Sequence, residues 1–287
     1  MKSASSNPTK KASNLKLRIV SGVIGGALLL GSVWWGGESF VLLFSLIALL
    51  SAHELLKLAQ THIKHPAKNF GVLSAAVILL LHGLHLIGIW QTWAWLWAVV
   101  FLFFFLCIAL LYDRHQGQPL EVMALHCAVW FYVLLPFMLY MRSAYLFGSF
   151  YQYYVALGFL LLLWANDTGA YFVGKALGKN KLFPRISPGK TWEGAIGGAV
   201  LSMFVALWLS SVFKSLSVEQ WVGMSFLITL GGIYGDLTES MIKRSLGVKD
   251  SGTLIPGHGG LLDRFDGLLL ASPLVAAWLF WTTQVST

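Results

Sequence analysis

The sequence contains nine apolar stretches, each long enough to cross a lipid bilayer as a helix. A helix needs roughly 20 apolar residues to span the hydrocarbon core. Charged residues make up only 11% of the 287 residues, against about 25% in an ordinary soluble domain. We therefore predict an all-α, polytopic integral membrane protein with about nine transmembrane helices. The predicted spans are 19–37, 39–58, 69–89, 92–112, 122–141, 152–174, 191–213, 220–243 and 262–283.

Polarity divides the chain into three parts. Residues 1–18 are rich in Ser, Asn and Lys and lack apolar periodicity, which predicts a disordered tail. Residues 19–150 are transmembrane helices, and 151–287 are transmembrane helices with polar residues at their ends, which predicts a catalytic region. No segment is long enough for a separate soluble domain. Cys107 and Cys127 lie in apolar stretches without metal-ligand spacing, so we interpret both as core residues.

The basic residues predict the orientation. With a cytoplasmic N-terminus, eighteen of the twenty Lys and Arg residues fall on the cytoplasmic side, and only Arg142 and Lys214 fall outside. This asymmetry obeys the positive-inside rule. We expect a protein of the bacterial inner (cytoplasmic) membrane type, with its N-terminus and active site cytoplasmic. Ten of the twelve acidic residues share that side. Because acids in or beside spans are costly in lipid, they are candidates for function.

The densest group of ionisable residues runs from Asp236 to Asp266. On the eighth span, Asp236 begins a helical face that continues through Glu239, Ser240 and Lys243. Asp263 and Asp266 open the ninth span after a polar, Gly-rich loop. Mg²⁺ prefers one or two carboxylates together with substrate phosphates and waters, so this arrangement predicts a magnesium site. The alternative is a set of ion pairs that holds two helices together.

A second polar group joins the sixth and seventh spans. Asp167 and Lys175 share one helical face, and the basic, Gly-rich segment 174–194 follows. Such a segment suits the binding of phosphate by backbone amides and lysines. The Gly-Lys-Thr at 189–191 is not the end of a P-loop, because Pro184 stands where the first glycine should be and no strand precedes it.

Glu54 on the second span has two interpretations. With His53 and Lys57 it does not complete an HExxH zinc motif. It either points into a site from the N-terminal half or is a satisfied buried acid near the interface.

The segment from Ser240 to Asp266 reads, in order, S-x-I-K-R, K-D-S-G and I-P-x-H-G-G-L-x-D-R-F-D. It resembles the signature of the phosphatidate cytidylyltransferases, also called CDP-diacylglycerol synthases. D-x-G-A-Y from Asp167 and S-P-x-K-T-x-E-G from Ser187 resemble the same family. The resemblance covers the C-terminal half closely, and the first 150 residues only as apolar spans. This sequence departs from the family pattern at Gly189, where the family usually has a lysine.

The resemblance implies transfer of CMP from CTP to phosphatidate, giving CDP-diacylglycerol and pyrophosphate in phospholipid biosynthesis. It implies Mg²⁺, with a second, monovalent cation as an open question, no nucleic-acid partner, and a homodimer in the bilayer. It places Mg²⁺ on Asp236 and Asp263, with Asp266 in the second coordination shell or as an alternate ligand. The implied catalytic residues are Lys243, Arg244, Lys249, Asp250, His258, Arg264 and Asp266. The implied substrate-binding residues are Asp167, Lys175, Ser187, Lys190, Thr191 and Glu193.

Three other functions compete with this one. A CTP-dependent kinase of a lipid alcohol would need a base to deprotonate the hydroxyl. An anion transporter would carry charges near the bilayer midplane and show inverted repeats. A non-catalytic scaffold would have no use for so many ionisable residues between Asp236 and Arg264.

Overall fold

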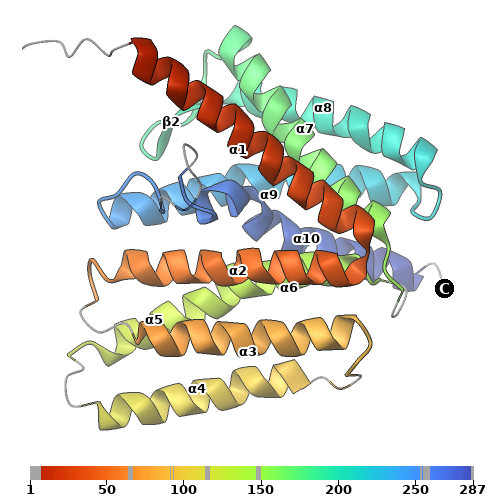
Figure 1. The fold of residues 1–287 in the computed structure, drawn as a ribbon. Coiled ribbons are helices and arrows are strands. Elements are labelled where there is room, and N and C mark those ends of the chain that lie inside the picture. Colours follow the sequence, from red (N-terminus) through yellow and green to blue (C-terminus); the bar gives the residue numbers. More distant parts are fainter. Residues whose placement is uncertain are drawn as a thin grey trace, which may run out of the picture.

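The computed structural model describes residues 8–63, 67–90, 92, 94–113, 117–146, 150–252, 254 and 259–285, without the side chains of 8–18, 94 and 285. Helices dominate these residues, which confirms the predicted fold class (Figure 1). The N-terminal helices are α1 (Pro8–Trp35), α2 (Gly37–Ala59), α3 (Lys68–Leu86), α4 (Ala94–Tyr112), α5 (Pro119–Ala128), η1 (Val129–Leu134) and α6 (Leu135–Ser143). The C-terminal elements are α7 (Tyr153–Leu177), β1 (Lys181–Phe183), β2 (Ser187–Thr191), α8 (Trp192–Val212), α9 (Val218–Ser245) and α10 (Leu262–Val285).

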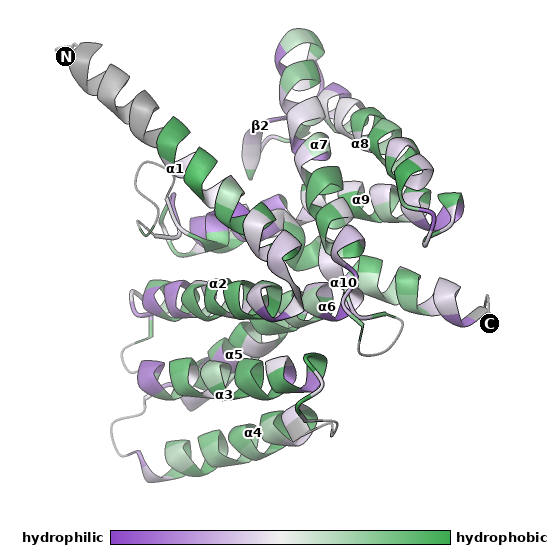
Figure 2. Cartoon of the chain, turned by 45° about the vertical axis from the view of Figure 1, so that its right-hand side comes forward, coloured by the Kyte–Doolittle hydropathy of each residue, from purple (hydrophilic) through white to green (hydrophobic). Residues whose placement is uncertain are grey.

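Seven helices in the described part of the chain are long and apolar enough to cross a membrane. They are α2, α3, α4, α7, α8, α10 and the continuous helix α5–η1–α6. The other two predicted spans do not meet this criterion in the described residues, so the predicted count of nine is approximate. The described apolar part of α1, Ile19–Trp35, is shorter, and α9 carries acidic and basic residues in its C-terminal third. Figure 2 shows hydrophobic helices whose polar residues gather toward their ends.

Helix α1 starts earlier than the sequence led us to expect. We predicted a disordered tail to residue 18, but the helix begins at Pro8, and residues 1–7 lie outside the described part. Proline suits a first helical turn, whose N–H groups have no intrahelical partner. Lys, Ala and Leu in the following residues are good helix formers. A helix nucleated in the apolar stretch therefore extends backward at little cost.

The predicted span 122–141 is one helix with a wider segment inside it. Residues Val129–Leu134 form a π-helical turn between α5 and α6. Pro136 follows this turn. A proline ring inside an α-helix collides with the carbonyl four residues earlier, here that of Tyr132, and lacks the N–H that would bond to it. We attribute the wider turn to the relief of this collision.

Aromatic rings form the centre where the N-terminal and C-terminal halves meet. Phe44 of α2 packs against Tyr140 of α6 at 4.9 Å between ring centroids, and Tyr140 packs against Phe159 of α7 at the same distance. Phe265 of α10 contacts Phe44 and Phe137. All five side chains are buried. This packing fixes α10, which carries three of the predicted site residues, against the N-terminal helices.

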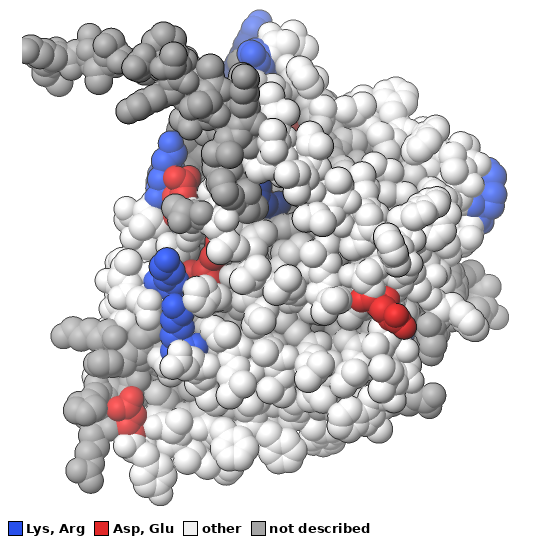
Figure 3. All heavy atoms as spheres, viewed as in Figure 1, with Lys and Arg blue, Asp and Glu red and all other residues white. Residues whose placement is uncertain are grey.

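The segment 174–194 contains an antiparallel hairpin that we did not predict. Lys181 pairs with Thr191 and Phe183 pairs with Ser187. The hairpin and the connection between α9 and α10 lie at the same end of the helices (Figure 1). On the face shown in Figure 3, most charged side chains lie along that end, and the middle of the face is uncharged.

Candidate active site

A pocket of about 510 Å³ opens where α7, β2, α8, α9 and α10 meet. This volume lies in the range of small-molecule sites. The charged residues of its lining are Asp167, Lys175, Lys190, Asp236 and Asp266. The sequence groups 167–194 and 236–266, which are distant along the chain, therefore contribute to one site.

Close contact between α9 and α10 explains how two of these acids share the pocket. A Cβ atom added at Gly235 would lie 2.3 Å from the backbone oxygen of Asp266, and one added at Gly231 would lie 2.3 Å from Cα of Ala271. Both glycines let the two backbones touch. This contact brings Asp236 on α9 beside Asp266 on α10.

Asp236 is held by partners from two elements. Its Oδ2 lies 2.6 Å from Nζ of Lys190 on β2, and its Oδ1 accepts a hydrogen bond of 3.2 Å from the Ser240 hydroxyl. Lys190 also donates to the backbone oxygen of Ile233 at 3.2 Å. The hairpin is therefore tied to α9 at the pocket.

The pocket is lined by more acidic than basic side chains. Three carboxylates line it, those of Asp167, Asp236 and Asp266, against two lysines, Lys175 and Lys190. Like charges repel strongly where solvent is partly excluded, so an added cation would be attracted to the three acids. Within the described residues, no three His, Cys, Asp or Glu side chains already form a metal-binding group.

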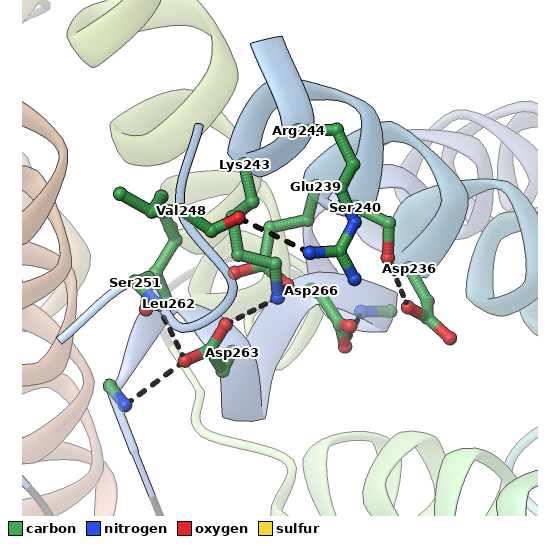
Figure 4. A network of polar contacts seen from close by, with 12 residues as sticks. Asp236, Glu239, Ser240, Lys243, Arg244, Val248, Ser251, Leu262, Asp263 and Asp266 are labelled. Carbon is green, nitrogen blue, oxygen red and sulfur yellow. Dashed lines mark hydrogen bonds and ion pairs between the residues drawn. The ribbon is translucent and has the colours of Figure 1, made fainter. Parts of the chain in front are cut away.

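Asp263 lies in a different setting, outside the lining of this pocket. Its Oδ1 is 2.5 Å from Nζ of Lys243, and its Oδ2 accepts backbone hydrogen bonds from Ser251 at 2.9 Å and Gly260 at 3.1 Å. Lys243 also lies 3.4 Å from Oε2 of the buried Glu239. In Figure 4, Asp263 with Lys243 and Ser251 lies to one side and Asp236 with Ser240 to the other. The two predicted metal ligands thus have different surroundings.

The other described candidates of the α9–α10 region do not line the pocket. Arg244 is exposed and donates to the backbone oxygen of Val248 at 3.3 Å. Lys249, Asp250 and Arg264 are exposed and do not line the described pocket. His258 lies outside the described residues.

The predicted substrate-binding residues of the hairpin region differ in whether they line the pocket. Thr191 is buried, lines the pocket and caps α8 by accepting a hydrogen bond from the Gly194 amide. Glu193 accepts hydrogen bonds from the backbone amides of Lys179 and Asn180. Neither Glu193 nor Ser187 belongs to the pocket lining. In this structure Glu193 therefore fixes the start of the hairpin.

Two residues outside the predicted set belong to the site or its support. Asn166 is 3% exposed and lines the pocket beside Asp167. An amide inside an apolar span was the signal that could have marked it. Glu54 of α2 accepts a hydrogen bond of 3.0 Å from the backbone N–H of Leu262, at the start of α10. The sequence left this contact open, because no local pattern joins residues 208 positions apart.

Comparison with known proteins places these motifs in a wider group. A sequence model described as the cytidylyltransferase family matches residues 16–282. A phosphatidate cytidylyltransferase of Brucella suis is 32% identical over 280 residues, which cover 92% of each chain. Phosphatidate cytidylyltransferases of Staphylococcus haemolyticus and Staphylococcus aureus are 32% and 33% identical over 263 residues, covering 91% of this chain and 97% of theirs. The similarity thus includes the N-terminal helices, where the motifs alone gave no information.

Proposed function

Because the chain belongs to the cytidylyltransferase family, we propose that it transfers CMP from CTP to phosphatidate and releases pyrophosphate. The observation that carries this proposal is the pocket itself. It combines three carboxylates with two lysines at the charged end of a set of apolar helices. A charged nucleotide and a lipid headgroup can meet there while the lipid tails remain among the helices.

The reaction explains why the site needs cations more than a strong base. An oxygen of the phosphatidate phosphate attacks the α-phosphorus of CTP, and the bond from that phosphorus to the bridging oxygen of the β-phosphate breaks. A phosphate monoester has its second pKa at about 6, so the nucleophile is already an anion near neutral pH. The obstacle is repulsion between two anions, which positioning and positive charge overcome. Lys175 and Lys190, which line the pocket, would bind phosphates of CTP.

The same pocket suits Mg²⁺. Bound between carboxylates and substrate phosphates, this ion would neutralise charge that develops on the phosphates. Asp236 and Asp266, which share the pocket, would be its ligands, with Asp167 on α7 beside them. Asp263 would also be a ligand if its Oδ1 bound the metal in place of Lys243. Lys243 would then be released toward a phosphate, in the role that the motif implies.

The proposal includes the membrane setting. The distribution of Lys and Arg supports a cytoplasmic N-terminus and active site in a bacterial inner membrane, where CTP is available. Phosphatidate would enter from the bilayer between helices. A homodimer and a second, monovalent cation stay predictions.

Turnover of the purified protein tests the function. Detergent-solubilised enzyme is given CTP and Mg²⁺, with phosphatidate or with a lipid alcohol, and pyrophosphate release is measured. The proposal expects release only with phosphatidate and its loss in Asp236→Asn. Nucleoside diphosphate formed with the lipid alcohol would instead favour the kinase.

A further inference from the structure

Glu54 is a buried carboxylate that the N-terminal half contributes to the edge of the site. It lies on α2 and is 5% exposed. It does not line the pocket. A buried acid is costly unless its oxygens have partners, so its contacts indicate what it does.

Its contact is with the first residue of α10. The N–H groups in the first turn of a helix have no intrahelical partner and must be satisfied from elsewhere. Oε2 of Glu54 accepts the N–H of Leu262 at 3.0 Å. A carboxylate at this position also interacts favourably with the positive end of the helix dipole. Glu54 therefore caps α10 from another transmembrane helix.

The chain before α10 lies directly on this carboxylate. A Cβ atom added at Gly252 would lie 2.5 Å from Oε1 of Glu54, and one added at Gly260 would lie 2.7 Å from Oε2. A side chain at either position would have to displace the Glu54 carboxylate. Glu54 thus touches the described parts of the α9–α10 connection on both sides of residues 255–258.

The capped helix end also holds the site acids. Asp263 follows Leu262 and accepts the amide of Gly260, which packs on Glu54. Asp266 comes one turn later and lines the pocket. A shift of the α10 N-terminus would therefore move both acids, whereas the apolar contact of Phe44 with Phe265 would still keep α2 and α10 together.

We propose that Glu54 is a positioning residue for CMP transfer. It fixes the N-terminus of α10 and the adjoining connection so that Asp263 and Asp266 keep their places at the site. The inference rests on the proposed function. It assigns to the N-terminal half a direct part in the geometry of catalysis, beyond that of a membrane scaffold.

Four variants test this proposal in purified, detergent-solubilised protein. Glu54→Ala removes the acceptor, Glu54→Asp keeps the charge but is too short by one methylene, and Glu54→Gln keeps an acceptor oxygen at full length. Glu38→Gln on the same helix, where the side chain is exposed, is the control. For each we would measure kcat, KM for CTP and the thermal unfolding temperature.

We expect Glu54→Ala and Glu54→Asp to lower kcat roughly 10- to 100-fold per folded molecule, the usual effect of losing a group that orients a site. Glu54→Gln should recover most of the activity, and Glu38→Gln should match wild type. If Glu54→Ala does not fold, the comparison of Asp with Gln decides. Equal kcat in those two variants, or wild-type kcat in folded Glu54→Ala, would overturn the proposal. Wild type that makes no lipid-linked CMP would instead refute the proposed function.

Discussion

Nζ of Lys190 on the β1–β2 hairpin lies 2.6 Å from Oδ2 of Asp236 on α9. This ion pair joins two segments that are 46 residues apart in the sequence. The pair lies at the pocket, where both side chains remain partly exposed, at 26% and 37%. Under the proposed function, Lys190 would exchange this pairing with Asp236 for a phosphate of CTP. The contact links the two motifs that predicted the site.

Replacing Lys190 should weaken CTP binding more than it weakens folding. A charge-assisted hydrogen bond contributes about 1.5–3 kcal/mol, so Lys190→Ala should raise KM for CTP roughly 10- to 100-fold. Lys181→Ala is the matched control, because Lys181 is on the same hairpin and outside the pocket lining. Steady-state kinetics with varied CTP would measure KM for each of the two variants. Equal KM values in the two variants would contradict a phosphate-binding role for Lys190.

The two acids of α10 should respond differently to loss of charge. Asp266→Asn should raise the Mg²⁺ concentration needed for half-maximal rate and leave the unfolding temperature near that of wild type. Asp263→Asn removes the charge that pairs with Lys243 in a part-buried ion pair. Breaking a fully buried pair typically costs roughly 3–5 kcal/mol, so a smaller loss here should still lower the unfolding temperature. Magnesium titration beside thermal unfolding distinguishes the roles. A raised Mg²⁺ requirement in Asp263→Asn alone would assign the metal to Asp263 in place of Asp266.

Much of this site was predictable, for a clear reason. The residues that share the pocket from one helix, Asp167 and Lys175, are separated by about two helical turns, so periodicity places them on neighbouring parts of one side. The hairpin was missed because its strands are short and its residues are not β-branched or aromatic for the most part. The Glu54–Leu262 contact depends on the packing of α2 against α10, which no local pattern encodes.

The same limit applies to the metal ligands. Sequence spacing treats Asp236 and Asp263 as equivalent acids at the ends of adjacent helices. Only the fold reveals that three donors surround Asp263 and that Asp266 points into the pocket. The close approach at Gly235 brings the backbone of Asp266 against α9, next to Asp236.

The contact at Gly235 gives a steric prediction. An alanine methyl would lie 2.3 Å from the backbone oxygen of Asp266, so α9 and α10 must separate. We expect Gly235→Ala to lower kcat at least 10-fold and to lower the unfolding temperature, because overpacking costs about 1–3 kcal/mol. Gly25→Ala is the control, since a methyl there meets open space. Wild-type kcat in Gly235→Ala would mean that this spacing does not matter for the reaction.

Gly189 offers a test by gain of function. The family usually has a lysine there, and a Cβ at this position meets nothing within 4 Å although the residue lines the pocket. Gly189→Lys should therefore fit and add a cation near the phosphates, which lowers KM for CTP. Gly189→Ala is the control for the loss of glycine at this position without an added charge. A KM unchanged or raised in the lysine variant, with alanine neutral, would place the triphosphate elsewhere.

The fate of the phosphorus atoms of CTP tests the central claim most directly. Purified wild type is incubated with phosphatidate, Mg²⁺ and CTP labelled either at the α- or at the γ-phosphorus, and the lipid fraction is separated from the aqueous one. We predict that the α-label enters the lipid and the γ-label leaves as pyrophosphate. Label from the γ-position in the lipid, with CDP in water, would contradict nucleotidyl transfer and identify a kinase.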